Sequence, residues 1–330
     1  MVGIRLHTHR WRAMQTYRAV RSSVRGLRRN LLLRKSRSKV RRAVGRADFA
    51  RAAQLRITVL PNRLEWADHK FRSRYAIEKI FTVLKIKPQQ FSPWDQYDLY
   101  LNWQDLTRNE LDAEEYLTVA YQYSRNPGWE DNAISLNLGC RDISKNKIGQ
   151  LNLQVFGYEL DVDPTTHTGD LVIKSNNNAT HDGVVVRGPV SPASVSEDKV
   201  YGVAIDNTDG DWVVDFRVPY IRGFCGFFYE KRRPRISRFS NINSKVRMRD
   251  IAEEVSSEEL NRLEAFCHAL RADYGELDVI RDKKTGKIYV VDFANTPAGP
   301  PNGLKRNLAF VAVERMSVSF IQNVLKPNRL

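Results

Sequence analysis

The sequence predicts an α+β fold, and three observations lead to this class. Short apolar runs that end in turn residues, such as 57–60, are typical of buried strands. Apolar side chains recur at helical spacing over 66–85 and again over 257–274. Two further apolar runs, 275–280 and 287–293, flank a polar turn that ends in glycine, which predicts an antiparallel hairpin. Helices and antiparallel strands in one chain indicate the α+β class.

The positive charge of the chain lies in an N-terminal arm. The 330 residues carry 53 Lys and Arg against 38 Asp and Glu, which gives a formal net charge of +15. Residues 1–46 contain 15 of these bases and no acid, so the remainder of the chain is electrically neutral. This distribution argues against a basic fold that wraps nucleic acid, and a nucleic-acid partner is not expected. A hydrophobic fraction of 42% excludes disorder throughout.

Several sequence features restrict the compartment. Three scattered cysteines form neither a disulfide framework nor a zinc-site spacing, which favours a reducing environment. No apolar run approaches the roughly 18 residues that a membrane helix needs, and the N-terminus lacks the apolar region of a secretory signal. We therefore expect a cytoplasmic protein, either free or held peripherally at the inner face of the membrane.

An amphipathic helix is predicted within the basic arm, residues 1–50. Its apolar face carries Trp11, Met14, Tyr17, Val20, Val24, Leu27 and Leu31, and arginines fill much of the remaining surface. Three interpretations stay open: a helix on an anionic membrane surface or acidic polymer, an arginine-rich tail that contacts RNA, and a helix that packs on its own domain or stays solvated. The acid-poor start also resembles an organelle transit peptide.

Two further units are expected after the arm. A small α/β lobe is predicted over 56–135, because a strand, an amphipathic helix and a second strand at 98–103 follow one another. Residues 136–330 are expected to form the larger unit. Its predicted strands, besides the hairpin, are 170–174, 184–186, 213–219 and 226–230, and its final helix carries Leu308 to Ile321.

Asp278 and Asp292 are the most informative pair in the sequence. They lie on the two strands of the predicted hairpin, between apolar residues that should face the core. Two carboxylates that face each other on paired strands repel, unless a divalent cation or a shared proton neutralises them. Oxygen ligands with an amide neighbour, and with no His or Cys, favour Mg²⁺ that bridges to a nucleotide. The alternative is that one aspartate merely caps a turn.

Segments upstream of the hairpin follow a recognisable order. They are Asp142-Ile143-Ser144-Lys145, Phe156-Gly157-Tyr158 with Pro164, Leu171-Val172-Ile173-Lys174 with a polar loop, Asp215-Phe216-Arg217-Val218-Pro219 with Gly223, Lys231-Arg232-Arg233 and Arg238-Phe239-Ser240-Asn241. With the hairpin, this order resembles the ATP-grasp superfamily over about residues 137–301. It is most similar to carboxylate–amine ligases of the ribosomal-protein glutamate ligase and teichuronopeptide-biosynthesis-like type. The resemblance implies an ATP-grasp fold, in which two α/β subdomains clasp a nucleotide, preceded by the small lobe and the basic arm.

The resemblance implies a role for each matching residue, with ATP and Mg²⁺ as cofactors. The residues that would bind the nucleotide are Lys145, Lys174, Asn176, His181, Gly183 and Asp206. The catalytic residues, which would face the γ-phosphate or the substrate carboxylate, are Arg217, Lys231 and Arg238. The metal ligands would be Asp278, Asp292 and Asn295.

The sequence departs from the family pattern at four places, one of which is the second metal position, where Asp292 replaces the usual, longer glutamate. The phosphate loop at 175–183 has one glycine where several are usual, although asparagine tolerates positive φ better than most residues. The hinge, residues Tyr201 to Asp206, which by the resemblance would hold the adenine, has Val203 where a carboxylate is usual. Ala294 stands where the metal-binding asparagine is expected, so Asn295 would reach the metal only if a kink before Pro297 rotates it back.

The resemblance implies an ATP- and Mg²⁺-dependent ligase that joins a small-molecule or peptide carboxylate to an amine through an acyl phosphate. Peptides and cell-surface polymers are the candidate substrates, and an anionic membrane or acidic polymer is the candidate partner of residues 1–46. The departures keep two alternatives open: a catalytically weakened nucleotide-binding or membrane-docking protein, and an ATP-dependent phosphotransferase of the same fold.

Overall fold

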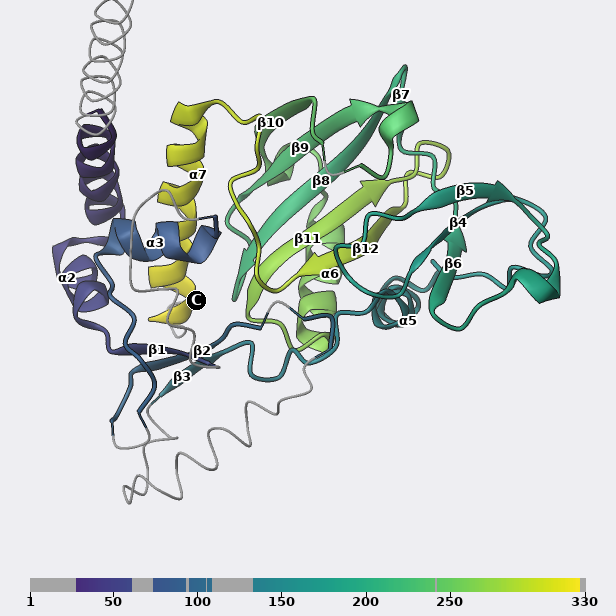
Figure 1. Ribbon diagram of the computed structural model, residues 1–330. Helices are drawn as coiled ribbons and strands as arrows, with labels where there is room; N and C mark the ends of the chain where they lie inside the picture. The colour runs from purple at the N-terminus through teal and green to yellow at the C-terminus, as the bar shows by residue number, and fades with distance from the viewer. Residues whose placement is uncertain are drawn as a thin grey trace, which may run out of the picture.

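The computed structural model describes residues 28–60, 74–92, 95–104, 106–108, 133–240 and 242–326. Within these ranges the strands form three sheets, and helices pack against them (Figure 1). The α+β class is therefore confirmed. No helix in the described part of the chain is long and apolar enough to cross a membrane.

The first sheet is small, parallel and buried. Its order is β1 (Ile57–Leu60), β2 (Leu99–Asn102) and β3 (Ile134–Leu136), and every residue of β1 and β2 is buried. Helix α2 (Arg46–Gln54) precedes β1, and α3 (Ala76–Leu84) lies between β1 and β2 in the chain. Continuous apolar runs are typical of strands covered on both faces, and the strands predicted at 57–60 and 98–103 are confirmed.

The second sheet is antiparallel and has six strands in the order β10-β9-β8-β11-β12, with β7 paired to β8. Its strands are β7 (Thr208–Asp209), β8 (Trp212–Ile221), β9 (Phe227–Pro234), β10 (Lys245–Asp250), β11 (Tyr274–Arg281) and β12 (Ile288–Ala294). Helix α6 (Ser257–Ala269) covers one face of this sheet, and α7 (Arg306–Ser319), continued by a π-helical turn at Phe320–Val324, covers part of the other (Figure 1).

The third sheet stands beside the large one and has the order β5-β4-β6. Its strands are β4 (Asp170–Ser175), β5 (Val184–Arg187) and β6 (Lys199–Val203). The chain enters it through helix α5 (Lys145–Phe156), which packs against β12 and α6. Single 3₁₀ turns lie at Pro192–Ser194, Arg235–Ser237 and Ile251–Glu253.

The two faces of β11 explain why the cavity lies where it does. Leu277 and Val279 face α5 and α6 in one apolar core. The alternate residues face the other side, where Tyr274 joins the core under α7 and Asp278 reaches an open space between the second and third sheets. Because side chains alternate along a strand, one strand both anchors the core and presents a carboxylate.

The described part of the arm is a helix over 28–44 that packs on the first lobe and on α7. Val40 is 1% exposed, the Ser36 hydroxyl donates a 2.6 Å hydrogen bond to Glu314, and Arg37 donates to the Thr82 carbonyl. Leu31, the member of the predicted apolar face that is described, is 55% exposed. The other members, from Trp11 to Leu27, lie outside the described residues.

Three sequence predictions are modified by the structure. The helix predicted over 66–85 begins at Ala76, because Tyr75 has an extended backbone; residues 61–73 lie outside the described part. The helix predicted over 257–274 ends at Ala269, where the chain turns through a positive φ at Arg271. The division into 1–50, 56–135 and 136–330 stays a prediction, but one apolar core contains residues of all three units.

The packing of the 28–44 helix can be measured by mutation. Val40→Ala is expected to lower the free energy of unfolding by about 2 kcal/mol, because it leaves a cavity between this helix and α7. Leu31→Ala, on the same helix but exposed, is expected to change it by less than about 0.5 kcal/mol. Urea unfolding of the full chain measures both, and equal effects would contradict the docked position of the helix.

Candidate functional site

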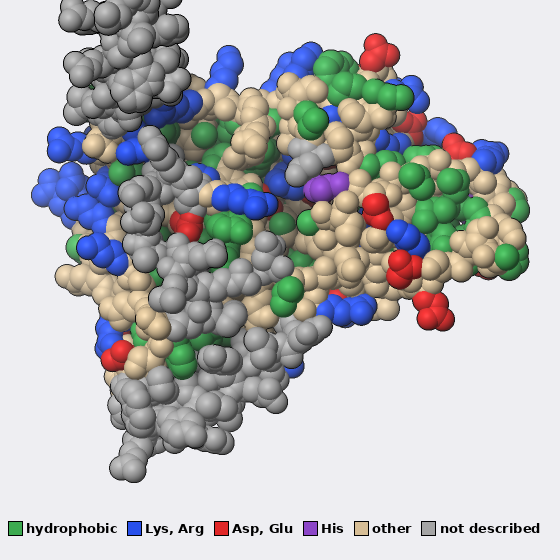
Figure 2. Space-filling model, viewed as in Figure 1, with side chains coloured by type: hydrophobic (Ala, Val, Ile, Leu, Met, Phe, Trp, Pro, Cys, Tyr) green, Lys and Arg blue, Asp and Glu red, His purple; other side chains and the backbone are tan. Residues whose placement is uncertain are grey.

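A cavity of about 340 Å³ opens between the second and third sheets. Figure 2 shows the surface hollowed between the lobe that carries β4–β6 and the rest of the molecule. One part of its wall is apolar, and the rest is formed by charged side chains from both sheets. The apolar lining includes Leu160, Val172, Val200, Val203, Ile205, Phe239, Ile280 and Val291. The charged lining is Arg74, Lys145, Asp161, Lys174, Asp182, Asp215, Arg217, Lys231, Arg233, Arg238, Asp278 and Asp292.

Asp278 and Asp292 face each other across the β11–β12 pair, and both line the cavity. The register pairs them directly, because an irregularity between Asp278 and Val279 shifts the pairing by one residue from the register that the turn alone would set. Burial raises the pKa of Asp292 above its ordinary value, and the charge of Asp278 adds to this effect, against nearby Lys145. One of the two carboxylates therefore resists ionisation unless a cation joins them.

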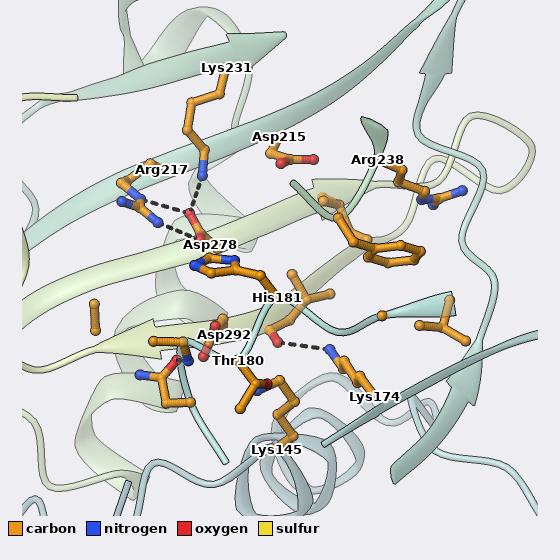
Figure 3. A pocket seen from close by; sticks show the side chains of 18 of the residues that line it. Lys145, Lys174, Thr180, His181, Asp215, Arg217, Lys231, Arg238, Asp278 and Asp292 are labelled. Carbon is orange, nitrogen blue, oxygen red and sulfur yellow. Dashed lines mark hydrogen bonds and ion pairs between the residues drawn. The ribbon is translucent and has the colours of Figure 1, made fainter. Parts of the chain in front are cut away.

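Asp278 is held by two cations that come from neighbouring strands. Arg217 on β8 donates to both of its oxygens, over 2.9 and 2.7 Å, and Lys231 on β9 donates over 2.8 Å (Figure 3). Burial alone would raise the pKa of Asp278, but these charges outweigh it and hold that pKa well below its usual range. The carboxylate of Asp278 is therefore ionised at neutral pH, and both cations on this side of the cavity are bound to it.

Lys145 enters the cavity from α5, and Lys174 enters it from β4 of the third sheet (Figure 3). Lys145 follows the N-cap Ser144 of α5, and its ammonium donates to the Asn177 carbonyl over 2.5 Å. Lys174 on β4 donates to the Val291 carbonyl over 3.4 Å. Burial lowers the pKa of Lys174, while Asp292 opposes that change. Two ammonium groups thus lie opposite the paired aspartates.

The loop 175–183 is closed by one carboxylate. Asp182 accepts hydrogen bonds from the backbone and hydroxyl of Ser175, from the Thr180 hydroxyl and from Lys199. Partial burial would raise the pKa of Asp182, but the hydrogen bonds from Ser175, Lys199 and Thr180 outweigh it and lower that pKa. The loop is therefore held in a defined shape although it has one glycine.

Positive φ angles fall on unexpected residues of this loop. Ala179 and His181 adopt φ of 58° and 53°, whereas the asparagines before them do not. For residues with a side chain this conformation costs about 1 kcal/mol or more each. Gly183 is needed for a different reason, since a Cβ there would lie 2.5 Å from the Phe239 ring. That contact joins the loop to the segment that follows β9.

Nine of the twelve predicted site residues line the cavity: Lys145, Lys174, His181, Gly183, Arg217, Lys231, Arg238, Asp278 and Asp292. In the view of Figure 3, His181 projects from its loop toward the two aspartates. Arg238 lies apart from Arg217 and Lys231, on the other side of the cavity. Its guanidinium donates to the Ile205 carbonyl and, over 2.8 Å, to Asn207, so it faces the hinge rather than the paired aspartates.

The three remaining predicted residues do not line the cavity. Asn176 accepts from the backbone of Lys145 and Asn146, so it caps the start of α5. Asp206 accepts from the backbone and hydroxyl of Thr208, which uses its carboxylate in a turn. Asn295 is buried at 6% exposure, and the chain before Pro297 does not rotate it into the cavity.

No group of three or more His, Cys, Asp or Glu side chains that could hold a metal occurs in the described ranges. In the part of the chain that the structure describes, the facing Asp278 and Asp292 are thus a pair and not part of such a group.

Several lining residues were not singled out by sequence reasoning. Asp161 follows α5, and burial raises its pKa to about 6 despite nearby Lys174. Asp215 and Arg233 form an ion pair on β8 and β9. A signal for this pair was available, because Asp215 and Arg217 alternate with apolar residues on β8, and four consecutive charged residues, 230–233, lie on the largely buried β9. For Asp161 the sequence holds no comparable pattern.

No family model matches the chain, and no curated protein matches it. A RimK domain ATP-grasp protein from Sphaerobacter thermophilus is 13% identical with a TM-score of 0.43, over 82% of this chain and 99% of that one. The D-alanine–D-alanine ligase of Bacillus anthracis is 15% identical with a TM-score of 0.49, over 83% and 98%. The macrocyclase MdnC of Microcystis aeruginosa is 12% identical with a TM-score of 0.43, over 82% and 99%. The chain is similar to these ATP-grasp proteins, at identities too low to assign it a substrate.

The close approach of Gly183 to the Phe239 ring can be tested by adding a methyl group at position 183. Gly183→Ala is expected to lower the free energy of unfolding by about 1–2 kcal/mol, because the new methyl group would overlap the Phe239 ring. In a Phe239→Ala background the same change should cost clearly less, since the two residues are in contact. Urea unfolding of the four proteins measures this coupling. An equal cost in both backgrounds would show that the two segments do not meet.

The hydrogen bonds that Asp182 accepts from Ser175, Thr180 and Lys199, here called the Asp182 clamp, predict that the stability of the protein depends on pH. The folded-state pKa of Asp182 is lowered, so its contribution to stability is present above the unfolded value of 3.8 and is lost as the pH falls toward the folded value. Asp182→Asn should therefore destabilise the protein at pH 6, and the difference from the natural chain should shrink below pH of about 3.8. Exposed Asp211, changed to Asn, is the control in urea unfolding at both pH values. A difference that is independent of pH would contradict the clamp.

Proposed function

We propose that the chain is an ATP-grasp ligase that uses ATP and Mg²⁺ to join a carboxylate to an amine. The observation that carries the proposal is the arrangement of Asp278 opposite Asp292 in a cavity that Lys145 enters from α5 and Lys174 enters from β4. Paired carboxylates that face paired ammonium groups across an open space suit a magnesium–phosphate ligand, whose metal and oxygens carry the complementary charges.

The rest of the cavity fits a nucleotide. Leu160, Val172 and Ile280 are among the apolar side chains that offer a slot for a flat base. Arg238 stands at the hinge, where it would contact the base or ribose rather than the γ-phosphate. The lysines are compact charges suited to phosphate oxygens, and the loop 175–183 would cover them.

The aspartates fit Mg²⁺ without a third protein ligand. Magnesium in nucleotide sites is commonly bound by one or two carboxylates, with phosphate oxygens and water completing six positions. Asp278 and Asp292 would hold the ion, and Asn295 would not take part because it lies outside the cavity. The bound ion would neutralise phosphate charge and so assist displacement at the γ-phosphate.

The chain's own groups would supply positioning and charge in phosphoryl transfer to a carboxylate. Arg217 and Lys231 are buried cations beside Asp278, placed to receive negative charge that develops on the transferred group. Arg74 and Tyr75 line the edge of the cavity next to the segment 296–298, where the carboxylate and then the amine would enter. The acyl phosphate would transfer its acyl group to the amine and release phosphate.

We test the function with the full chain, ATP, Mg²⁺ and a panel of small and peptide carboxylates, with hydroxylamine as the trapping amine. ADP and a hydroxamate should form only when carboxylate and Mg²⁺ are both present. Asp292→Asn should lower kcat/KM by about 100-fold or more, because it removes charge that neutralises the phosphates. Asp209→Asn, exposed on β7, is the matched control and should retain activity.

Other outcomes of this experiment separate the alternatives. Nucleotide binding without ADP formation would favour the catalytically weakened protein, which the position of Asn295 outside the cavity supports. A stable phosphorylated product without hydroxamate would favour an ATP-dependent phosphotransferase.

The proposal extends to an acidic partner of the arm. The helix over 28–44 and α2 expose Arg34, Lys35, Arg41, Arg42 and Arg46. Figure 2 shows Lys and Arg side chains gathered at this edge of the molecule. Such a surface suits an anionic membrane or acidic polymer, and it would hold the enzyme near substrates at the cytoplasmic face.

Charge neutralisation tests this surface without disturbing the packing of the helix. A variant in which Gln replaces Arg34, Lys35, Arg41 and Arg42 should bind phosphatidylserine vesicles about 100-fold or more weakly. Each base near such a surface contributes on the order of 1 kcal/mol to binding. Gln at Lys283 and Lys284, in the distant hairpin turn, is the control. Vesicle sedimentation measures binding, and equal binding by both variants would refute the membrane part of the proposal.

A further inference from the structure

Glu276 is a buried carboxylate without a hydrogen-bond partner. It lies on β11, two residues before Asp278, and its side chain is 1% exposed. Among the described residues, neither of its oxygens accepts a hydrogen bond. Buried polar atoms in native proteins are almost always paired, so an unpaired carboxylate beside a binding site calls for a functional explanation.

Arg217 is the cation nearest to this carboxylate, but it is turned toward another one. Its Nε lies 3.7 Å from Glu276 Oε2, whereas it donates to both oxygens of Asp278 over 2.9 and 2.7 Å. Lys231 also donates to Asp278. Two cations therefore share one carboxylate, and Glu276 keeps only a long contact.

The polar groups near Glu276 do not donate hydrogen bonds to it. The Tyr229 hydroxyl is buried nearby and also has no hydrogen-bond partner among the described residues. Lys79 donates to the carbonyls of Arg74 and Gly299 instead. Of the cations in the described ranges, Arg217 is the one at ion-pair distance from Glu276.

We infer that Glu276 is a second, reserved partner of Arg217: when magnesium and nucleotide occupy the Asp278 end of the cavity, Arg217 leaves Asp278 and pairs with Glu276. The inference rests on the proposed function. A divalent cation on Asp278 repels the guanidinium, and Nε needs to move by only about 1 Å to reach hydrogen-bond distance of Glu276.

This exchange links metal binding to a buried ion pair. A guanidinium displaced from Asp278 without a new partner would be a buried, uncompensated charge, which is costly. Glu276 removes that cost, so it favours the state in which Asp278 is available to the metal. Glu276 does not line the cavity and is a positioning residue that acts through Arg217.

The isosteric change Glu276→Gln tests the exchange. Calorimetry gives the Kd of a non-hydrolysable ATP analogue with and without Mg²⁺, and the ratio of the two values measures the coupling. Glu276→Gln should reduce this ratio about tenfold, which is the scale of a charge-assisted hydrogen bond, while the metal-free Kd changes by less than about twofold. The Tm of the free protein should stay or rise, because the change removes a buried unpaired carboxylate.

Two further variants distinguish a direct contact between Glu276 and Arg217 from a general effect of negative charge in the sheet. Glu276→Asp keeps the charge but withdraws it from Arg217, so the coupling should fall as it does with Gln. Glu230→Gln alters a carboxylate of the same sheet that is 3% exposed and paired with Arg232 and Arg249 on its opposite face. It should lower the Tm and leave the coupling intact.

The failures are distinguishable. An unchanged coupling in Glu276→Gln, or a normal coupling in Glu276→Asp, would overturn the exchange while the ligase proposal stands. A fall in the Tm of Glu276→Gln comparable to that of Glu230→Gln would show a purely structural ion pair. Absence of nucleotide binding by the unaltered chain would overturn both the exchange and the proposed function.

Discussion

The carboxylate of Asp278, shared by Arg217 and Lys231, determines how the large sheet and the cavity fit together. The three residues come from β11, β8 and β9, so one buried anion ties three adjacent strands on a single face. Removing Asp278 would leave the two buried cations without their shared carboxylate, at a cost of several kcal/mol. The alignment of the strands and the charge available to a ligand are therefore consequences of the same interaction, and neither can be altered alone.

Local patterns in the sequence were sufficient for the parts of the fold that local physics determines. The hairpin was predicted from its turn and its apolar runs, and Asp278 and Asp292 face each other as predicted, although their pairing depends on a register shift beside Asp278 that the turn alone does not set. Apolar runs located β1, β2, β4, β5, β8, β9, β11 and β12, whereas β3, β6, β7 and β10 were not predicted from them. The lysines at 145 and 174 were found through the order of segments rather than through any property of a lone lysine.

The features that the sequence did not predict depend on how distant segments pack. Arg238 follows β9 but binds the Ile205 carbonyl, and no spacing rule places a guanidinium against a hinge more than 30 residues earlier. Asn176 was expected at the phosphates, yet its amide is taken by the start of α5. In the sequence, Glu276 is indistinguishable from any other polar residue of a strand. Only the packed structure shows that its carboxylate is buried without a hydrogen-bond partner among the described residues.

Helix α7 lies in the last part of the chain but completes the core of the first lobe. Glu314 binds Ser36, and Lys326 binds Asp48, each across 278 positions. During synthesis on a ribosome, β1–β3 and α3 would thus keep apolar surface exposed until α7 has emerged, a situation in which chaperones are useful. A premature stop codon ahead of α7 would cost the product its first lobe as well as its last helix.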